Sequence, residues 1–127
     1  LEAYALRILG GTMLNGGRPG GAVPLFERAL ALQTTHGDTL AIGVTLDRLA
    51  AAQHALGRRD EARARWHEAL AAHARAGHRR WEAVTRAYLA ELALEEGDLA
   101  EASRQLEAAG QRAREAKDPH AEVAVGI

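Results

Sequence analysis

Residues 57–69 read GRRDEARARWHEA, and their pattern returns forty residues earlier and forty residues later. Five columns define the register: a leucine before the turn, the glycine of the turn, and then a small, a bulky and a second small residue. A fixed period of this length is typical of a helical repeat array, a class that more often holds a partner than transforms a substrate. The columns are Leu9, Leu49 and Leu89; Gly17, Gly57 and Gly97; Ala22, Ala62 and Ala102; Phe26, Trp66 and Leu106; and Ala29, Ala69 and Ala109.

Composition and charge agree with such an array. Apolar residues make up 47% of the 127 residues and aromatic residues only 4%, so alanine and leucine must provide the packing of closely spaced helices. The formal net charge is -1 with acidic and basic residues interleaved, which disfavours nucleic-acid binding. The chain has no cysteine for a disulfide or thiolate site, and neither a membrane-spanning run nor a signal peptide is visible. We therefore expect a cytoplasmic protein.

The breaks in the apolar pattern predict one repeat domain over residues 1–127, with units at 1–38, 39–78 and 79–118 and a partial fourth unit at 119–127. Asp38 and Asp98 precede helices as N-caps, and Asp98 with Glu101 has capping-box spacing. A seventh helix from His120 would stop before completion, so we expect a piece of a longer protein. The predicted helices cover about 2–15, a segment after the glycine-rich turn 16–21 that ends near 34–37, then 39–56, 61–75, 79–96, 99–116 and 120–127.

The small and bulky residues of each second helix, Ala22 with Phe26 and Ala62 with Trp66, together with GDLAEA at 97–102, resemble the tetratricopeptide repeat. The resemblance covers three units and implies an all-α, right-handed superhelix of antiparallel helix pairs, with six full helices and a partial seventh. Units of forty residues resemble the arrays of SARP-type and LuxR-type bacterial regulators and of related signalling ATPases. The richness in Ala, Arg and Gly resembles an actinobacterial source. The implied function is a protein-interaction scaffold within a larger transcriptional or signalling regulator.

In tetratricopeptide arrays the first helix of each unit lines a concave groove, and the resemblance places the partner-binding residues there. An alternative function is a sensor that binds a peptide or a small molecule in the same groove. The expected partner is a protein or peptide, or another domain of the same parent chain, and the partial seventh helix offers a route to self-association. The predicted site residues are Tyr4, Arg7, Asn15, Asp47, Arg48, His54, Glu91 and Glu95.

Other chemistry is not expected. His67 and His73 are six residues apart, which puts them on different faces of a helix, so we predict exposed or partly packed histidines and no metal or cofactor. The glycines of 16–21 lack the Gly-Lys-Ser/Thr ending of a phosphate-binding loop. Ser103, the only serine, falls inside a predicted helix with no base beside it, so no enzyme is expected.

Overall fold

The computed structural model describes residues 2–117, and throughout that range the regular structure is helical, without a strand. The prediction of an all-α protein is therefore confirmed. The predicted seventh helix lies outside the described residues. The helices are α1 (Ala3–Asn15), α2 (Pro19–His36), α3 (Thr39–Ala55), α4 (Arg59–Ala76), α5 (Arg79–Glu95) and α6 (Leu99–Lys117).

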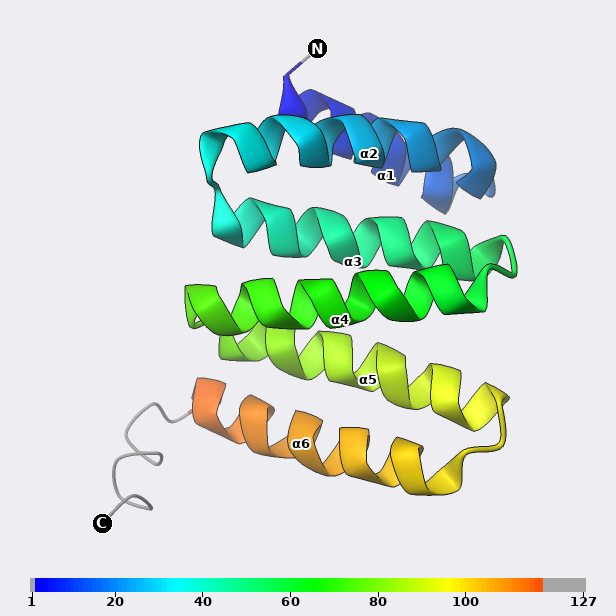
Figure 1. The fold of residues 1–127 in the computed structure, drawn as a ribbon, viewed down its shortest axis with the longest axis vertical. Helices are drawn as coiled ribbons and strands as arrows, with labels where there is room; N and C mark the ends of the chain where they lie inside the picture. The colour runs from blue at the N-terminus through cyan, green and yellow to red at the C-terminus, as the bar shows by residue number, and fades with distance from the viewer. Residues whose placement is uncertain (1, 118–127) are drawn as a thin grey trace.

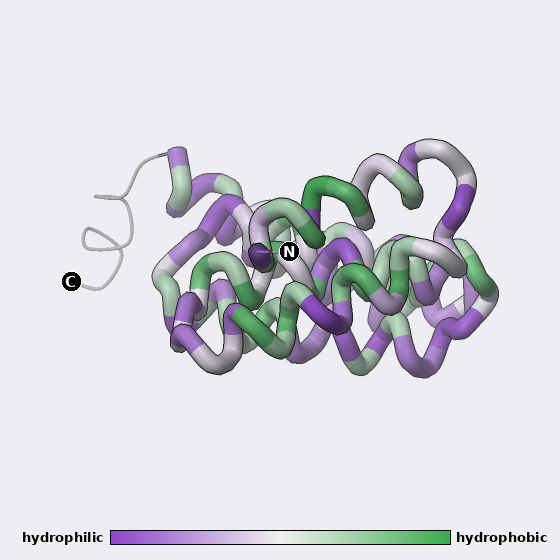
Figure 2. Tube along the Cα trace, turned by 90° about the horizontal axis from the view of Figure 1, so that it is seen from above, coloured by the Kyte–Doolittle hydropathy of each residue, from purple (hydrophilic) through white to green (hydrophobic). Residues whose placement is uncertain are grey.

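The helices lie one after another in chain order, and each packs mainly against its neighbours in the sequence (Figure 1). Two apolar clusters result instead of a single central core. One surrounds Phe26 and Leu49 where α2 meets α3, and the other surrounds Trp66 and Leu89 where α4 meets α5. Hydrophobic and hydrophilic stretches are interspersed along the trace (Figure 2). Helix α3 is buried around most of its circumference, because neighbouring helices pack on both sides of it.

The turn glycines of the repeat adopt the backbone conformation that their column predicts. Gly17, Gly57 and Gly97 have φ of 78°, 77° and 76°, a left-handed region that glycine enters without the steric cost of a Cβ. Both predicted caps are also confirmed. Asp38 Oδ1 accepts a hydrogen bond from the Ala41 amide at 3.2 Å, and Asp98 Oδ1 accepts one from the Glu101 amide at 3.1 Å.

Helix α2 begins earlier than the sequence predicted. Gly20 and Gly21 belong to the helix, which starts at Pro19, and the turn is confined to residues 16–18. A Cβ at Gly21 would lie 2.2 Å from the terminal Cε atom of Met13, so this glycine lies at a contact between α1 and α2 rather than in a turn. Helix α4 likewise begins at Arg59, two residues before the predicted start.

Two of the repeat columns are buried inside the described stack of helices but exposed at its ends. Leu49 and Leu89 are 2% and 5% exposed, whereas Leu9 in the same column is 44% exposed. Leu106, predicted to fill the space between units as Phe26 does, is 52% exposed, and that prediction is wrong. The reason is that within residues 2–117 no helix precedes α1 and none follows α6 to cover these side chains.

Candidate partner-binding surface

Asp47 is buried, which corrects its prediction as a groove residue. Its side chain is 3% exposed and lies between α4 and α5. The Asp47 carboxylate accepts hydrogen bonds from His73 Nε2 at 2.6 Å and from Thr85 Oγ1 at 2.7 Å. The prediction placed both position 47 and position 48 in the groove. Successive residues are about 100° apart around an α-helix, and here only Arg48 faces outward.

His73 is also fully buried, contrary to the prediction of an exposed or partly packed ring. Gly43 makes room for it, since a Cβ there would lie 2.6 Å from the imidazole, and Trp81 stacks on the ring at 5.6 Å. The order of the hydrogen bonds is not that of a catalytic triad, because Thr85 donates to Asp47 and not to the histidine. We interpret Asp47, His73 and Thr85 as a structural joint of α3, α4 and α5.

A second bridge lies near the opposite end of the same helices and brings two predicted site residues together. His54 Nε2 of α3 lies 2.8 Å from Glu95 Oε2 of α5. Arg59 of α4 lies 3.6 Å from the same carboxylate oxygen. The three side chains are between 30% and 50% exposed, so this bridge reaches the surface. Arg59 is not among the predicted site residues, because the sequence shows it only as part of an arginine-rich turn.

An aromatic stack supports the surface beside this bridge. The Trp66 side chain is 2% exposed, and Tyr88 lies on it with 5.5 Å between ring centroids and 14° between ring planes. The His54 ring lies 5.6 Å from Trp66. Sequence reasoning missed Tyr88, which is 36% exposed, although it stands forty residues after Arg48 in the same repeat position.

The predicted residues thus separate into two groups. Arg48 on α3 and Glu91 on α5 are exposed, Glu91 one turn before Glu95, and neither forms an ion pair with any residue of 2–117. On α1, Tyr4 is 66% exposed, the Arg7 guanidinium lies 5.5 Å from its ring centroid, and Asn15 is exposed at the end of the helix. We define the α3–α5 surface as the set on two neighbouring first helices, namely Arg48, His54, Tyr88, Glu91 and Glu95.

The charged residues that line two clefts elsewhere pair with one another. A cleft of about 430 Å³ between α4 and α6 is lined by Arg63, Glu96 and Glu101, among others. The hydrogen bond to Glu96 raises the pKa of Arg63, and the bond from Arg104 lowers the pKa of Glu101. These internal pairs leave little charge in the cleft for a ligand.

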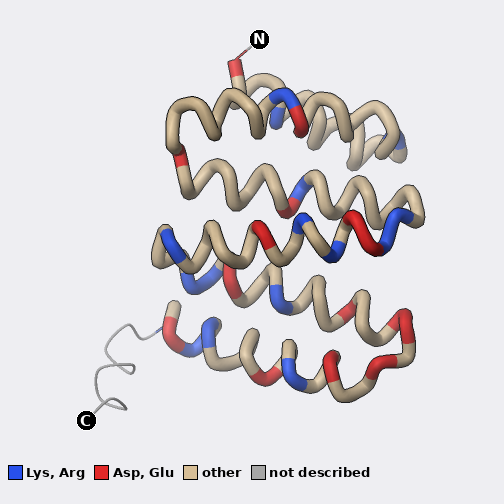
Figure 3. Tube along the Cα trace, viewed as in Figure 1, with Lys and Arg blue, Asp and Glu red and all other residues tan. Residues whose placement is uncertain are grey.

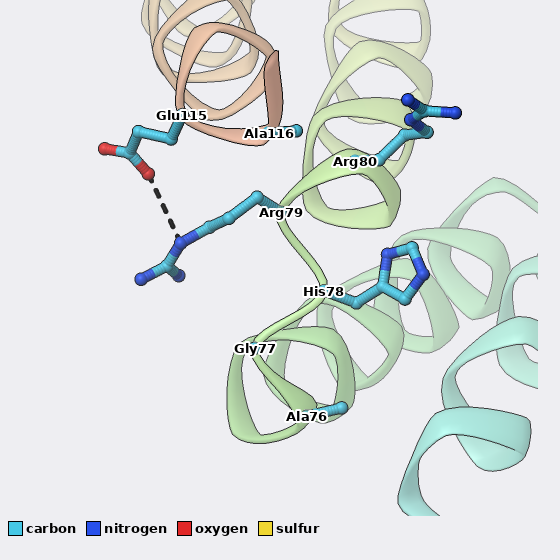
Figure 4. A pocket seen from close by; sticks show the side chains of 7 residues that line it. All are labelled: Ala76, Gly77, His78, Arg79, Arg80, Glu115 and Ala116. Carbon is cyan, nitrogen blue, oxygen red and sulfur yellow. Dashed lines mark ion pairs between the residues drawn. The ribbon is translucent and has the colours of Figure 1, made fainter. Parts of the chain in front are cut away.

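A second cleft, of about 510 Å³, lies at the turn between α4 and α5 (Figure 4). Arg79 points to Glu115 of α6, with 3.3 Å between Nε and Oε2, while Arg80 points away to the other side of the turn. The hydrogen bond from Arg112 lowers the pKa of Glu115. Among residues 2–117 no group of three or more His, Asp or Glu side chains could hold a metal ion.

Comparison with known proteins adds no family: no protein-family profile matches the chain, and no characterised protein matches its sequence. In the part of the chain that the structure describes, none of the helices is both long and apolar enough to span a membrane.

Proposed function

We propose that the chain is a protein-interaction module that binds a partner segment on the α3–α5 surface. The module would be built as a right-handed tetratricopeptide-like superhelix and would belong to a larger transcriptional or signalling regulator. The proposal rests on one observation. Two exposed charged residues without ion pairs lie on helices that a buried set of hydrogen bonds holds together. Arg48 and Glu91 lie open on helices that Asp47, His73 and Thr85 tie together.

The composition of the surface supports recognition of a peptide or protein. Tyrosine and arginine are the residue types that most often dominate binding energy at interfaces. Tyr88 is held by Trp66, and His54 and Glu95 hold each other, so a partner would not have to order these side chains on binding. Arg48 on α3 and Glu91 on α5 make the surface complementary to a segment that carries both an acidic and a basic residue.

The test begins with peptides selected from a random display library on the immobilised 127-residue chain. Selected peptides are then measured against Arg48→Glu and against a matched control, Arg28→Glu, which changes an exposed arginine on α2. We expect Arg48→Glu to weaken binding by about tenfold or more, since a repelled charge at an interface costs at least about 1.4 kcal/mol. Circular dichroism should show both variants folded.

The control variant distinguishes binding at the α3–α5 surface from attraction by net charge. If Arg28→Glu weakens the selected peptides as much as Arg48→Glu does, binding follows net charge and the α3–α5 surface is not the site. The same conclusion follows if neither variant changes the affinity.

A further inference from the structure

Three carboxylates lie in the C-terminal half of α5 and at its C-cap, and other side chains of the chain pair with two of them. Glu91 is the exception, because it is exposed and has no ion pair within residues 2–117. The last turn of α5 contains no basic residue that could reach it. Acidic residues gather at this end of α5 and at the start of α6 (Figure 3). The internal partners are His54 and Arg59 for Glu95, and Arg63 for Glu96.

Tyr88 lies one helical turn before Glu91 and on the same face of α5, because residues three apart are neighbours on a helix surface. Stacking on Trp66 fixes the plane of the Tyr88 ring, and the residue keeps 36% of its surface exposed. The face of an aromatic ring attracts a cation through its quadrupole. An oriented ring and an exposed carboxylate are therefore neighbouring positions on the surface of α5.

A guanidinium group satisfies ring and carboxylate together, because it is planar enough to stack and presents paired N–H donors to carboxylate oxygens. An ammonium group offers a single strongly hydrated charge and no flat face, so lysine fits less well.

We propose that Tyr88 and Glu91 form a binding site for an arginine side chain of the partner. The site rests on the proposed function and names one residue that the partner must carry. The arginine guanidinium stacks on the outer face of the Tyr88 ring and donates hydrogen bonds to the Glu91 carboxylate. Arg48 on the neighbouring helix then takes an acidic residue of the same partner.

The test is a titration of the isotopically labelled 127-residue chain, followed by the amide signals of Tyr88 and Glu91. The probe is the blocked peptide Gly-Ser-Arg-Ser-Gly, and its control carries citrulline, which keeps the shape of arginine without the charge. We expect saturable shifts with a millimolar dissociation constant for the arginine peptide and none for the citrulline peptide. Tyr88→Ala and Glu91→Gln should each weaken binding roughly threefold or more.

A matched variant separates this site from general attraction to acidic residues. Glu107→Gln removes another exposed carboxylate, on α6, and should leave the affinity unchanged. Equal binding of the citrulline peptide, no saturable shift, or equal losses in Glu107→Gln and Glu91→Gln would each overturn the arginine site. If library-selected peptides depend on Arg48 but not on Tyr88 or Glu91, the arginine site fails while the proposed function stands.

Discussion

The described stack has two junctions between successive helix pairs. Residues at equivalent repeat positions meet at both junctions, but their buried hydrogen bonds differ. Where α3 meets α1 and α2, Thr45 is 0% exposed and Gln33 is 5% exposed. The Thr45 hydroxyl and the Gln33 side-chain amide oxygen, Oε1, have no hydrogen-bond partner among the described residues. At the next junction Thr85 and His73, forty residues further on, both bond to one carboxylate.

The junctions differ at two repeat positions, Arg7 against Asp47 and Gln33 against His73. Asp47 supplies the carboxylate at the second junction, whereas the same repeat position of the first unit holds Arg7, which is half-buried over Tyr4. Repeats with the same backbone can therefore differ in how their units are joined. Each junction keeps one buried atom without a partner among the described residues, Gln33 Oε1 at the first and His73 Nδ1 at the second, so the contrast lies at the threonines. Because an unpaired buried hydroxyl costs free energy while a paired one stabilises, we expect Thr85 to hold the second junction more firmly than Thr45 holds the first.

The largest expected effect is that of Asp47→Ala. Removing the acid leaves the His73 ring and the Thr85 hydroxyl buried without their partner, so the free energy of unfolding should fall by about 3 kcal/mol. Urea unfolding followed by circular dichroism measures the loss. Arg7→Ala at the equivalent position should cost less than about 1 kcal/mol, the scale of an exposed cation–π contact. Equal losses for the two variants would remove the contrast between the junctions.

Gly43→Ala tests the space around the buried histidine. The new Cβ would lie 2.6 Å from the His73 ring, and relieving that overlap should cost about 2 kcal/mol. Gly11→Ala is the matched control in α1, because no atom lies within 4 Å of its added Cβ. There the higher helix propensity of alanine should raise stability by up to about 1 kcal/mol. A gain in both variants would show that the His73 ring is free to move.

Acid should affect α5–α6 through Glu115. The pKa of this carboxyl is lowered in the folded chain by the hydrogen bond from Arg112, so its contribution is present above the ordinary value of 4.5 and is lost as pH falls through the lowered pKa. Thermal unfolding between pH 6 and 3 should show a loss under about 1 kcal/mol from this group. Glu115→Gln should remove that part of the pH dependence, and an unchanged pH profile in the variant would contradict the assignment.

Much of the fold follows from local chemistry and could be predicted. The turn glycines need left-handed backbone, and aspartate at 38 or 98 caps a helix through its own neighbours, so each signal is contained in a few residues. The first residues of α2 and α4 were harder to predict, because glycine and arginine are compatible with both turn and helix. Gly21 in particular is explained only by Met13, a contact between helices.

The candidate site was harder to predict, because its residues depend on contacts across helices. Asp47 and Arg48 are equally polar, and only the positions of His73 and Thr85 show which of them is buried. Tyr88 could have been predicted from the repeat, because it occupies the same repeat position as Arg48. The stacking of Tyr88 on Trp66 could not have been predicted, since a contact between two helices leaves no periodic signal.

One pair of variants tests the contrast between the junctions most directly: Thr85→Val and Thr45→Val, which make the same small change at the same repeat position. Thr85→Val should lower the free energy of unfolding by about 1.5 kcal/mol, because it breaks a hydrogen bond to a buried carboxylate. Thr45→Val should raise it by about 1 kcal/mol, because it removes a buried hydroxyl that has no partner among the described residues. Losses of similar size in both variants would contradict the account.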